Sequence, residues 1–361
     1  MKVSATIDTI AFHDGRRDWA IAVQRIDSGR PGPTLLVMGG LHAGEQVGCE
    51  VAVRLGESIR QRLRRGTLLL VPFACLPASY AHGNTWGEVI SKNQVWPGNA
   101  DGNAKERLYD ALAAQLIPPV SHVLDLHCFT FYKAATAFAP VDDEACQTLA
   151  MAADVPFTLI QDPGQYDQPR RPAGEGDRMP KITTTMYCRR LGKPAALIEF
   201  PGHMLNRRNA ETGLRAVRRV LVELDMIEPV DTDETASPST TRLRVLQGAA
   251  PGDDAAYKSV MVHVPAPCDG LFLAGDKLPG DRVAQGQSLG RLYSPVDLAG
   301  RDIPAPVTGR VFRLGVRCTG GDIHAFAAAG EVLAQLVRLA EPGDEVTVYR
   351  SEISMQGAGI K

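Results

Sequence analysis

The chain has 361 residues, more than one ordinary compact core holds, so we expect two domains. Hydrophobic residues make up 44% and charged residues 22% of the chain, which is normal for a soluble globular enzyme. The formal net charge of -2 and the lack of a long uncharged apolar run predict no nucleic-acid partner, no membrane partner and no transmembrane helix.

The N-terminus and the cysteines indicate a cytoplasmic protein. The N-terminal residues lack the apolar segment of a signal peptide. The seven cysteines are scattered without C-x-x-C pairs and are interpreted as reduced thiols. A metal ion would therefore have to be held by His, Asp or Glu.

The first 228 residues alternate strand-like and helix-like segments. The apolar run 33–40 ends in glycines, as a buried parallel strand does, and apolar residues at steps of four predict a helix from Val47 to Leu63, closed by Gly66. This alternation predicts an α/β domain with a mostly parallel or mixed sheet flanked by helices. Further strands are predicted near 67–74, 120–127, 135–140, 156–160 and 194–200, and further helices near 104–116, 143–153, 182–191 and 206–226.

The composition changes after the domain formed by residues 1–228. Residues 229–242 are polar and acidic and are predicted to be a linker. Residues 243–361 are rich in glycine and valine, and PAPCDG (265–270) recurs there as PAPVTG (304–309). Two such hairpin units predict an all-β barrel-sandwich with a tail. The alternative is that PAP is a chance tripeptide in a chain rich in alanine and proline.

Four groups of polar residues lie at strand ends or in the long loop 75–103, and the carboxyl ends of strands are where ligands gather in α/β sheets. Catalytic zinc commonly takes three ligands from His and carboxylates and keeps one position for water. His42 and Glu45, three residues apart, can project to one side of a turn, and His127 would complete the set. Asp125 would point to the same side of its strand as His127 and could orient that imidazole.

Glu199 ends an apolar strand, where a buried carboxylate is unfavourable unless it has an interaction partner or a catalytic function. As a catalytic residue, Glu199 would be the general base and general acid. Zinc-bound water would be the nucleophile, and Glu199 would take a proton from that water and donate it to the leaving amine. The alternatives are ordinary structural roles. His42 could be a loop histidine bonded to backbone, His127 a buried strand-end histidine, and Glu45 a first-turn acid favoured by the helix dipole.

The order H-x-x-E, N-x-x-x-P-G, D-x-H and a strand-end Glu resembles the succinylglutamate desuccinylase/aspartoacylase family. These are carboxypeptidase-A-like zinc hydrolases that remove acyl groups from amines. The resemblance spans about residues 33–226, and the C-terminal domain looks like the lipoyl or biotinyl barrel of many bacterial members. By position, it implies one Zn²⁺ per chain on His42, Glu45 and His127, with Glu199 as the catalytic carboxylate.

One loop departs from the family pattern. Asn93 is kept, but Gln94 stands where the family has an arginine that clamps a substrate carboxylate, and no second arginine lies between Tyr80 and Ser91. We therefore expect Asn93, Gln94 and Lys92 to bind a small amide whose leaving group need not carry an α-carboxylate. Lys92, His82 or an arginine of the 161–180 loop could replace the missing arginines, but solvated charges are the favoured interpretation of those loop arginines.

The sequence thus predicts a zinc-dependent hydrolase that removes a small acyl group from an N-acylated amine or amino-acid-like substrate. An esterase with the same site is one alternative, and a degenerate, non-catalytic metal- or ligand-binding protein with a β-barrel interaction module is another. Carrier barrels present a modifiable lysine in the hairpin between their halves, and residues 292–297 contain none, so no covalent cofactor is expected. The barrel is expected to cover the zinc crevice or to mediate self-association into a homo-oligomer.

Overall fold

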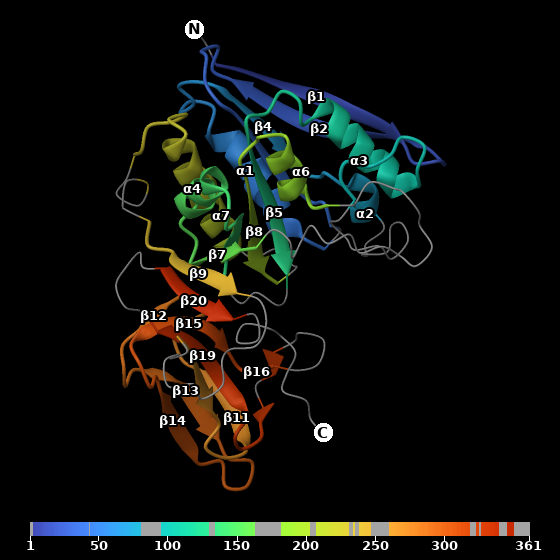
Figure 1. The fold of residues 1–361 in the computed structure, drawn as a ribbon. Helices are drawn as coiled ribbons and strands as arrows, with labels where there is room; N and C mark the ends of the chain where they lie inside the picture. Colours follow the sequence, from blue (N-terminus) through green and yellow to red (C-terminus); the bar gives the residue numbers. More distant parts are fainter. Residues whose placement is uncertain are drawn as a thin grey trace. The chain divides into compact units, whose positions relative to one another are not determined.

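The chain forms two compact units (Figure 1). One contains residues 1–129, 137–155 and 161–238, and the other contains 130–136, 156–160 and 239–361. The predicted domain boundaries and linker stay predictions. No helix among the described residues is long and apolar enough to cross a membrane. The computed structural model describes residues 3–42, 44–80, 95–129, 134–162, 182–202, 207–230, 234, 238–246, 260–317, 323–324, 326–338 and 345–349.

A mixed sheet forms the centre of the first unit, which confirms the predicted α/β class. The pairs β3–β4, β3–β5 and β5–β8 are parallel, whereas β1–β2 and β2–β4 are antiparallel. The spatial order of the strands is β1 (Ser4–His13), β2 (Asp18–Asp27), β4 (Thr67–Val71), β3 (Thr34–Gly39), β5 (His122–Phe129), β8 (Ala195–Pro201) and β6 (Thr136–Pro140).

Helices cover both faces of this sheet (Figure 1). The helix α7 packs on Phe200 and α1 packs on Leu126, whereas the core of α3 and α6 holds Val123 and Ala195. Because side chains alternate along a strand, Asp125, His127 and Glu199 share the α3 and α6 face. The helices are α1 (Gln46–Ser58), α2 (Leu76–Tyr80), α3 (Ala104–Gln115), α4 (Glu144–Ala152), α6 (Thr184–Arg190) and α7 (Arg207–Glu223).

Local capping explains where several helices begin. Asn103 and Glu106 form a reciprocal capping box at the start of α3, and the hydroxyl of Thr183 accepts a backbone N–H at the start of α6. The predicted extent of α1 was wrong at its C-terminal end. The helix stops at Ser58, and Leu63 instead forms a β-bridge with Ile227.

The second unit is built mainly from β-strands, as predicted for the C-terminal region. Two four-stranded sheets enclose an apolar core that includes Phe272, Leu289 and Leu336. One sheet has the order β10 (Met261–Pro265), β19 (Val332–Arg338), β15 (Gly309–Leu314) and β12 (Arg282–Val283). The other has the order β14 (Gly300–Pro304), β13 (Ser288–Tyr293), β11 (Gly270–Ala274) and β18 (Phe326–Ala327). Also present are β7 (Phe157–Gln161), β9 (Thr241–Leu246) parallel to β20 (Glu345–Tyr349), and the pair β16 (Val316–Arg317) and β17 (Ile323–His324).

The two copies of the repeat occupy equivalent places in these sheets. In each copy the first proline ends a strand, at Pro265 and Pro304, and the glycine begins the next, at Gly270 and Gly309. A Cβ at Gly270 would lie 2.6 Å from the carbonyl oxygen of Tyr293, and one at Gly309 would meet the carbonyl oxygen of Val337. The glycine is therefore required for the same close strand approach in both copies.

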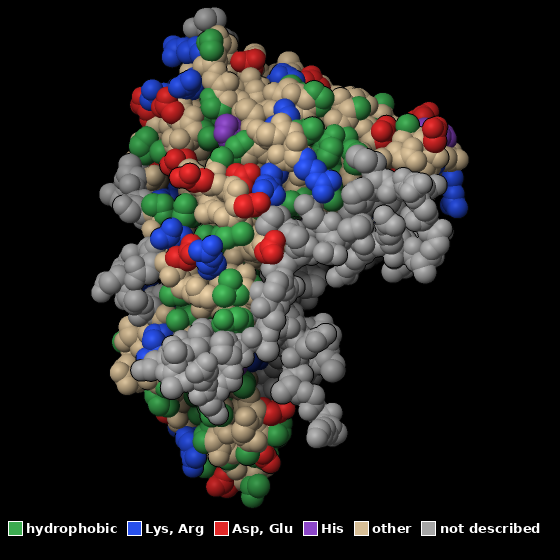
Figure 2. Space-filling view, in the orientation of Figure 1, with side chains coloured by type: hydrophobic (Ala, Val, Ile, Leu, Met, Phe, Trp, Pro, Cys, Tyr) green, Lys and Arg blue, Asp and Glu red, His purple; other side chains and the backbone are tan. Residues whose placement is uncertain are grey.

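Positive and negative side chains are interspersed over the face of the molecule in Figure 2. This agrees with the small net charge.

Candidate metal centre

The turn after β3 brings His42 and Glu45 together. Gly40 adopts a φ of +71°, a conformation that glycine takes without strain, and the chain then turns so that the Glu45 amide donates to the His42 carbonyl oxygen over 3.2 Å. Glu45 is the residue immediately before α1. Both side chains therefore leave the backbone at the carboxyl end of a parallel strand, where ligand sites of α/β sheets form.

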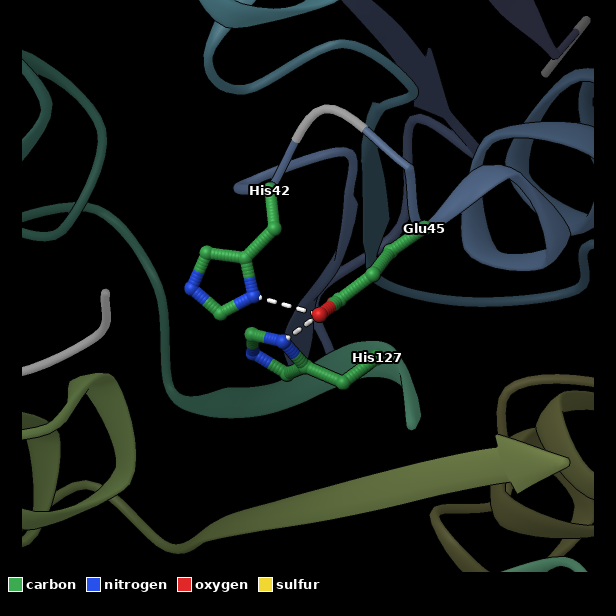
Figure 3. A group of neighbouring side chains, drawn as sticks. All are labelled: His42, Glu45 and His127. Atoms are coloured by element: carbon green, nitrogen blue, oxygen red, sulfur yellow. Dashed lines mark hydrogen bonds and ion pairs between the residues drawn. The ribbon is translucent and has the colours of Figure 1, made fainter. Parts of the chain in front are cut away.

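Three candidate ligands converge at this point. His42 Nδ1 lies 2.6 Å from Glu45 Oε1, and His127 Nδ1 lies 2.7 Å from Glu45 Oε2, as the dashed lines in Figure 3 show. The ring centroids of the two histidines are 4.9 Å apart. Glu45 is 5% exposed and His127 is 1% exposed, so the donors face one another in a largely dry site.

Asp125 lies on the other side of the His127 ring. Its Oδ2 atom is 3.0 Å from His127 Nε2, an ion-pair contact without hydrogen-bond alignment, and the residue is fully buried. The Nδ1 atom of the same ring faces Glu45. The structure thus holds one imidazole between two carboxylates, with Nδ1 directed at the candidate ligand set.

Mutual attraction among these groups controls how they ionise. Burial raises the pKa of Glu45, but the imidazoles of His127 and His42 outweigh that effect and hold its pKa well below the usual range. Burial lowers the pKa of His127, but the carboxylates of Asp125 and Glu45 outweigh that effect and hold its pKa well above the usual range. Without a metal, the site is therefore a carboxylate and an imidazolium in contact.

Glu199 stands beside this cluster with a different charge state. It is the register partner of His127 across β5 and β8, and its Oε2 atom is buried without a hydrogen-bond partner in the described structure. Burial raises the pKa of Glu199 to about 8, the charges of Glu45 and Asp125 add to the shift, and His127 opposes it. A carboxyl group with such a pKa can both accept and return a proton near neutral pH.

The three converging residues could hold a metal ion. Within the part of the chain that the structure describes, they are the only group of three or more His, Cys, Asp or Glu residues whose donor atoms gather closely enough, all within 4.8 Å of one another. Two imidazoles and one carboxylate are the ligand types of many catalytic zinc sites, which keep a further position open. The residues present therefore fit a zinc ion in donor type, burial and convergence.

Two cysteines near this cluster are not suited to catalysis. Burial raises the pKa of both the Cys49 and Cys128 thiols to about 12, with the charge of Glu45 adding to the shift. A nucleophilic cysteine needs a depressed pKa, so these thiols stay protonated and serve packing.

The predicted substrate-binding residues cannot be placed. Lys92, Asn93 and Gln94 lie outside the described residues, as does most of the 161–180 loop. Their roles stay predictions. Gly39 and Gly48 also lie where the candidate ligand segments meet, although nothing in the sequence predicts a function for either.

Comparison with known proteins finds a matching family model and a related protein. The family model described as the succinylglutamate desuccinylase/aspartoacylase catalytic domain matches residues 31–224. The N-alpha-acetyl-L-2,4-diaminobutyric acid deacetylase of Halomonas elongata is 33% identical over 97 residues, which are 27% of this chain and 28% of that protein. The chain therefore matches little more than a quarter of that relative's length.

Two solved structures share the fold over nearly the full chain. An aspartoacylase family protein from Mesorhizobium loti has a TM-score of 0.57 at 24% identity, covering 94% of this chain and 96% of that one. A succinylglutamate desuccinylase/aspartoacylase from Rhodobacter sphaeroides has a TM-score of 0.58 at 19% identity, covering 94% and 97%. At these identities the likeness shows the fold and does not show the substrate.

Proposed function

The chain belongs to the succinylglutamate desuccinylase/aspartoacylase family, and we propose that it is a zinc-dependent hydrolase of amide bonds. The family consists of deacylases, so removal of an acyl group is the activity that its members share. The proposed reaction releases a small acyl group from an N-acylated amine or amino-acid-like molecule. An ester would be hydrolysed by the same groups.

The observation that carries this proposal is the convergence of His42, Glu45 and His127 beside Glu199. In the proposal these first three residues hold one zinc ion, and Asp125 orients the His127 ring from its far side. Zinc bound there would act as a Lewis acid toward the acyl carbonyl and lower the pKa of a water molecule.

Glu199 is proposed to move the proton of the reaction. Its carboxylate accepts a proton from the attacking water and then donates that proton to the leaving nitrogen, so the group returns to its starting state. Without a metal, burial raises the pKa of Glu199 to about 8, and a zinc ion beside it would lower that pKa toward the range in which the carboxylate accepts a proton. The shielded Oε2 atom, with no competing hydrogen-bond donor among the described residues, supports the assignment.

The proposed substrate is small and N-acylated. The Halomonas relative is named as a deacetylase of an N-acetylated diamino acid, which supports an acetyl-sized acyl group. The glutamine at position 94 favours a leaving amine without an obligatory α-carboxylate, because glutamine cannot form the arginine fork that binds one. The proposed location is the cytoplasm, in agreement with the free thiols of the six described cysteines.

Metal analysis coupled to a substrate panel tests this function. We expect about one zinc ion per chain, lost in His42→Ala, and hydrolysis of N-acyl amines both with and without an α-carboxylate. A strong preference for N-acyl-α-amino acids would overturn the substrate proposal alone. A protein that binds zinc but hydrolyses nothing in the panel would be the non-catalytic binder, and an intact mass with a lipoyl or biotinyl adduct would indicate a carrier.

A further inference from the structure

Two glycines meet at the point where the three candidate ligand segments come together. Gly39 is the last residue of β3, three residues before His42, and Gly48 lies in the first turn of α1, three residues after Glu45. A Cβ at Gly39 would lie 2.5 Å from the carbonyl carbon of Gly48. A side chain of any size would therefore separate the end of the strand from the start of the helix.

Gly48 also faces the strand that carries the third ligand. A Cβ at Gly48 would lie 2.8 Å from the carbonyl oxygen and 2.9 Å from the Cβ of Leu126, the residue directly before His127. Both atoms belong to or adjoin the strand backbone, so neither can swing away. Gly48 thus lets the first turn of α1 rest directly on β3 and β5 at once.

We propose that Gly48 is a positioning residue for the metal centre, setting the separation between Glu45 and His127. The proposal rests on the proposed function because it presupposes a metal at these ligands. Its physical basis is that Glu45 directly precedes α1 and His127 lies in β5, while Gly48 of α1 packs against Leu126 of β5 close to both ligands.

The displacement expected from a side chain at position 48 is larger than the change that metal–ligand distances tolerate. A carbon and an oxygen that are not bonded approach to about 3.3 Å, so a methyl group at Gly48 would shift the helix by about half an ångström. Metal–ligand distances tolerate only about 0.2 Å. A helix shift of that size exceeds this tolerance, so we expect the carboxylate of Glu45 to leave coordination distance in Gly48→Ala.

The same helix offers a matched control. Gly56 also lies in α1, and a Cβ there would meet the end of the Gln24 side chain and the Leu70 Cδ1 atom, at 3.2 Å. Those are flexible side-chain ends that can move aside. Gly48→Ala and Gly56→Ala therefore make the same chemical change in one helix, and alanine is intrinsically the better helix former at both positions.

The test compares wild type, Gly48→Ala and Gly56→Ala for zinc affinity, by competition with a chromophoric chelator, and for the visible spectrum of the cobalt-loaded protein. We expect Gly48→Ala to bind zinc about 10–100-fold more weakly, the range found when groups that orient ligands are removed. We also expect an altered cobalt spectrum for Gly48→Ala, and Gly56→Ala to match wild type in both measurements.

Several results would overturn the proposal. Wild-type affinity and spectrum in Gly48→Ala would do so, as would equal losses in both variants. If Gly48→Ala is unfolded in buffer, the measurement is repeated in a stabilising osmolyte, and failure to fold there while Gly56→Ala folds would assign the contact to core packing alone. Failure of wild type to bind zinc would instead refute the proposed function, so the two failures are distinguishable.

Discussion

The substitution Glu199→Gln tests the electrostatics of the site without any metal. It replaces a carboxyl group with an amide of the same size, so the packing around β8 is kept. Burial raises the pKa of this carboxyl from 4.5 to about 8, with the charges of Glu45 and Asp125 adding to the shift. The substitution therefore removes a group whose charged form the folded protein disfavours.

The raised pKa of Glu199 determines how its contribution to the free energy of unfolding changes with pH. Because the folded pKa lies above the unfolded value, the stabilisation from Glu199 is fully present below about pH 4.5 and is lost as the pH rises through about 8. At about 1.4 kcal/mol per pKa unit, wild type should lose about 2 kcal/mol relative to Glu199→Gln between about pH 5 and 7, with a ceiling of about 5 kcal/mol above pH 8. Because the charges of His127 and Glu45 act on Glu199, the difference between the two proteins reports the titration of Glu199 together with the change it causes in those two neighbours.

Urea denaturation of both proteins in EDTA, repeated across this pH range, measures the effect. The free energy of unfolding of Glu199→Gln should fall less steeply with pH than that of wild type, and Glu57→Gln on the exposed side of α1 should follow wild type. Parallel curves for wild type and Glu199→Gln would refute the reasoning, because they would mean that Glu199 titrates alike in the folded and unfolded chains.

Three further predictions concern ligand binding and the second unit. Zinc affinity should fall as the pH falls, by up to about tenfold per pH unit, because zinc must displace a proton from His127, whose pKa its two carboxylate neighbours hold well above the usual range. Chelator competition at several pH values checks this, and an affinity independent of pH would contradict it. Asp125→Asn should weaken zinc binding about 10–100-fold in the same assay, whereas an unchanged affinity would exclude an orienting role. Arg310→Ala should lower the free energy of unfolding by about 2–4 kcal/mol, because the buried guanidinium donates to Thr241 Oγ1 and to the carbonyl oxygens of Gly280 and Ser239. Urea denaturation measures the loss, Arg310→Lys should not restore it, and the exposed Arg301→Ala is the control.

Much of the first unit could be predicted because its local signals agree with its tertiary structure. The helix predicted near 104–116 is α3, and its start is fixed locally by the capping box of Asn103 and Glu106. The apolar runs of β3 and β8 lie within two residues of their predicted limits, since strands buried on both faces leave a continuous hydrophobic signal.

Other elements lacked such a signal. The hairpin of β1 and β2 was not predicted, because the first six residues of β1 are exposed on both faces and leave no alternation to detect. The short helix α2 lies in a stretch predicted to be a loop. The C-terminal end of α1 was predicted too late, because Leu63 keeps the apolar spacing of a helix but pairs with Ile227, far along the chain.

The candidate site also has features that the sequence predicts and one feature that it does not. The proximity of His42 and Glu45 follows from three-residue spacing after a strand, and the common face of Asp125 and His127 follows from strand alternation. The contact of Gly48 with Leu126 left no mark in the sequence, because it depends on the depth at which a helix packs on a sheet. The spacing of residues in a sequence shows which side chains point the same way. How closely a helix packs on a sheet is set by contacts between segments that are far apart in the sequence.

We propose that this chain hydrolyses amides with a metal held by His42, Glu45 and His127. The most direct measurement is the rate of acyl release from an N-acetylated amine by the purified protein before chelation, after removal of metal, and after addition of one zinc equivalent. We expect activity to be lost with the metal and restored by zinc. Activity that survives complete removal of the metal, or its absence from fully zinc-loaded protein, would contradict the account.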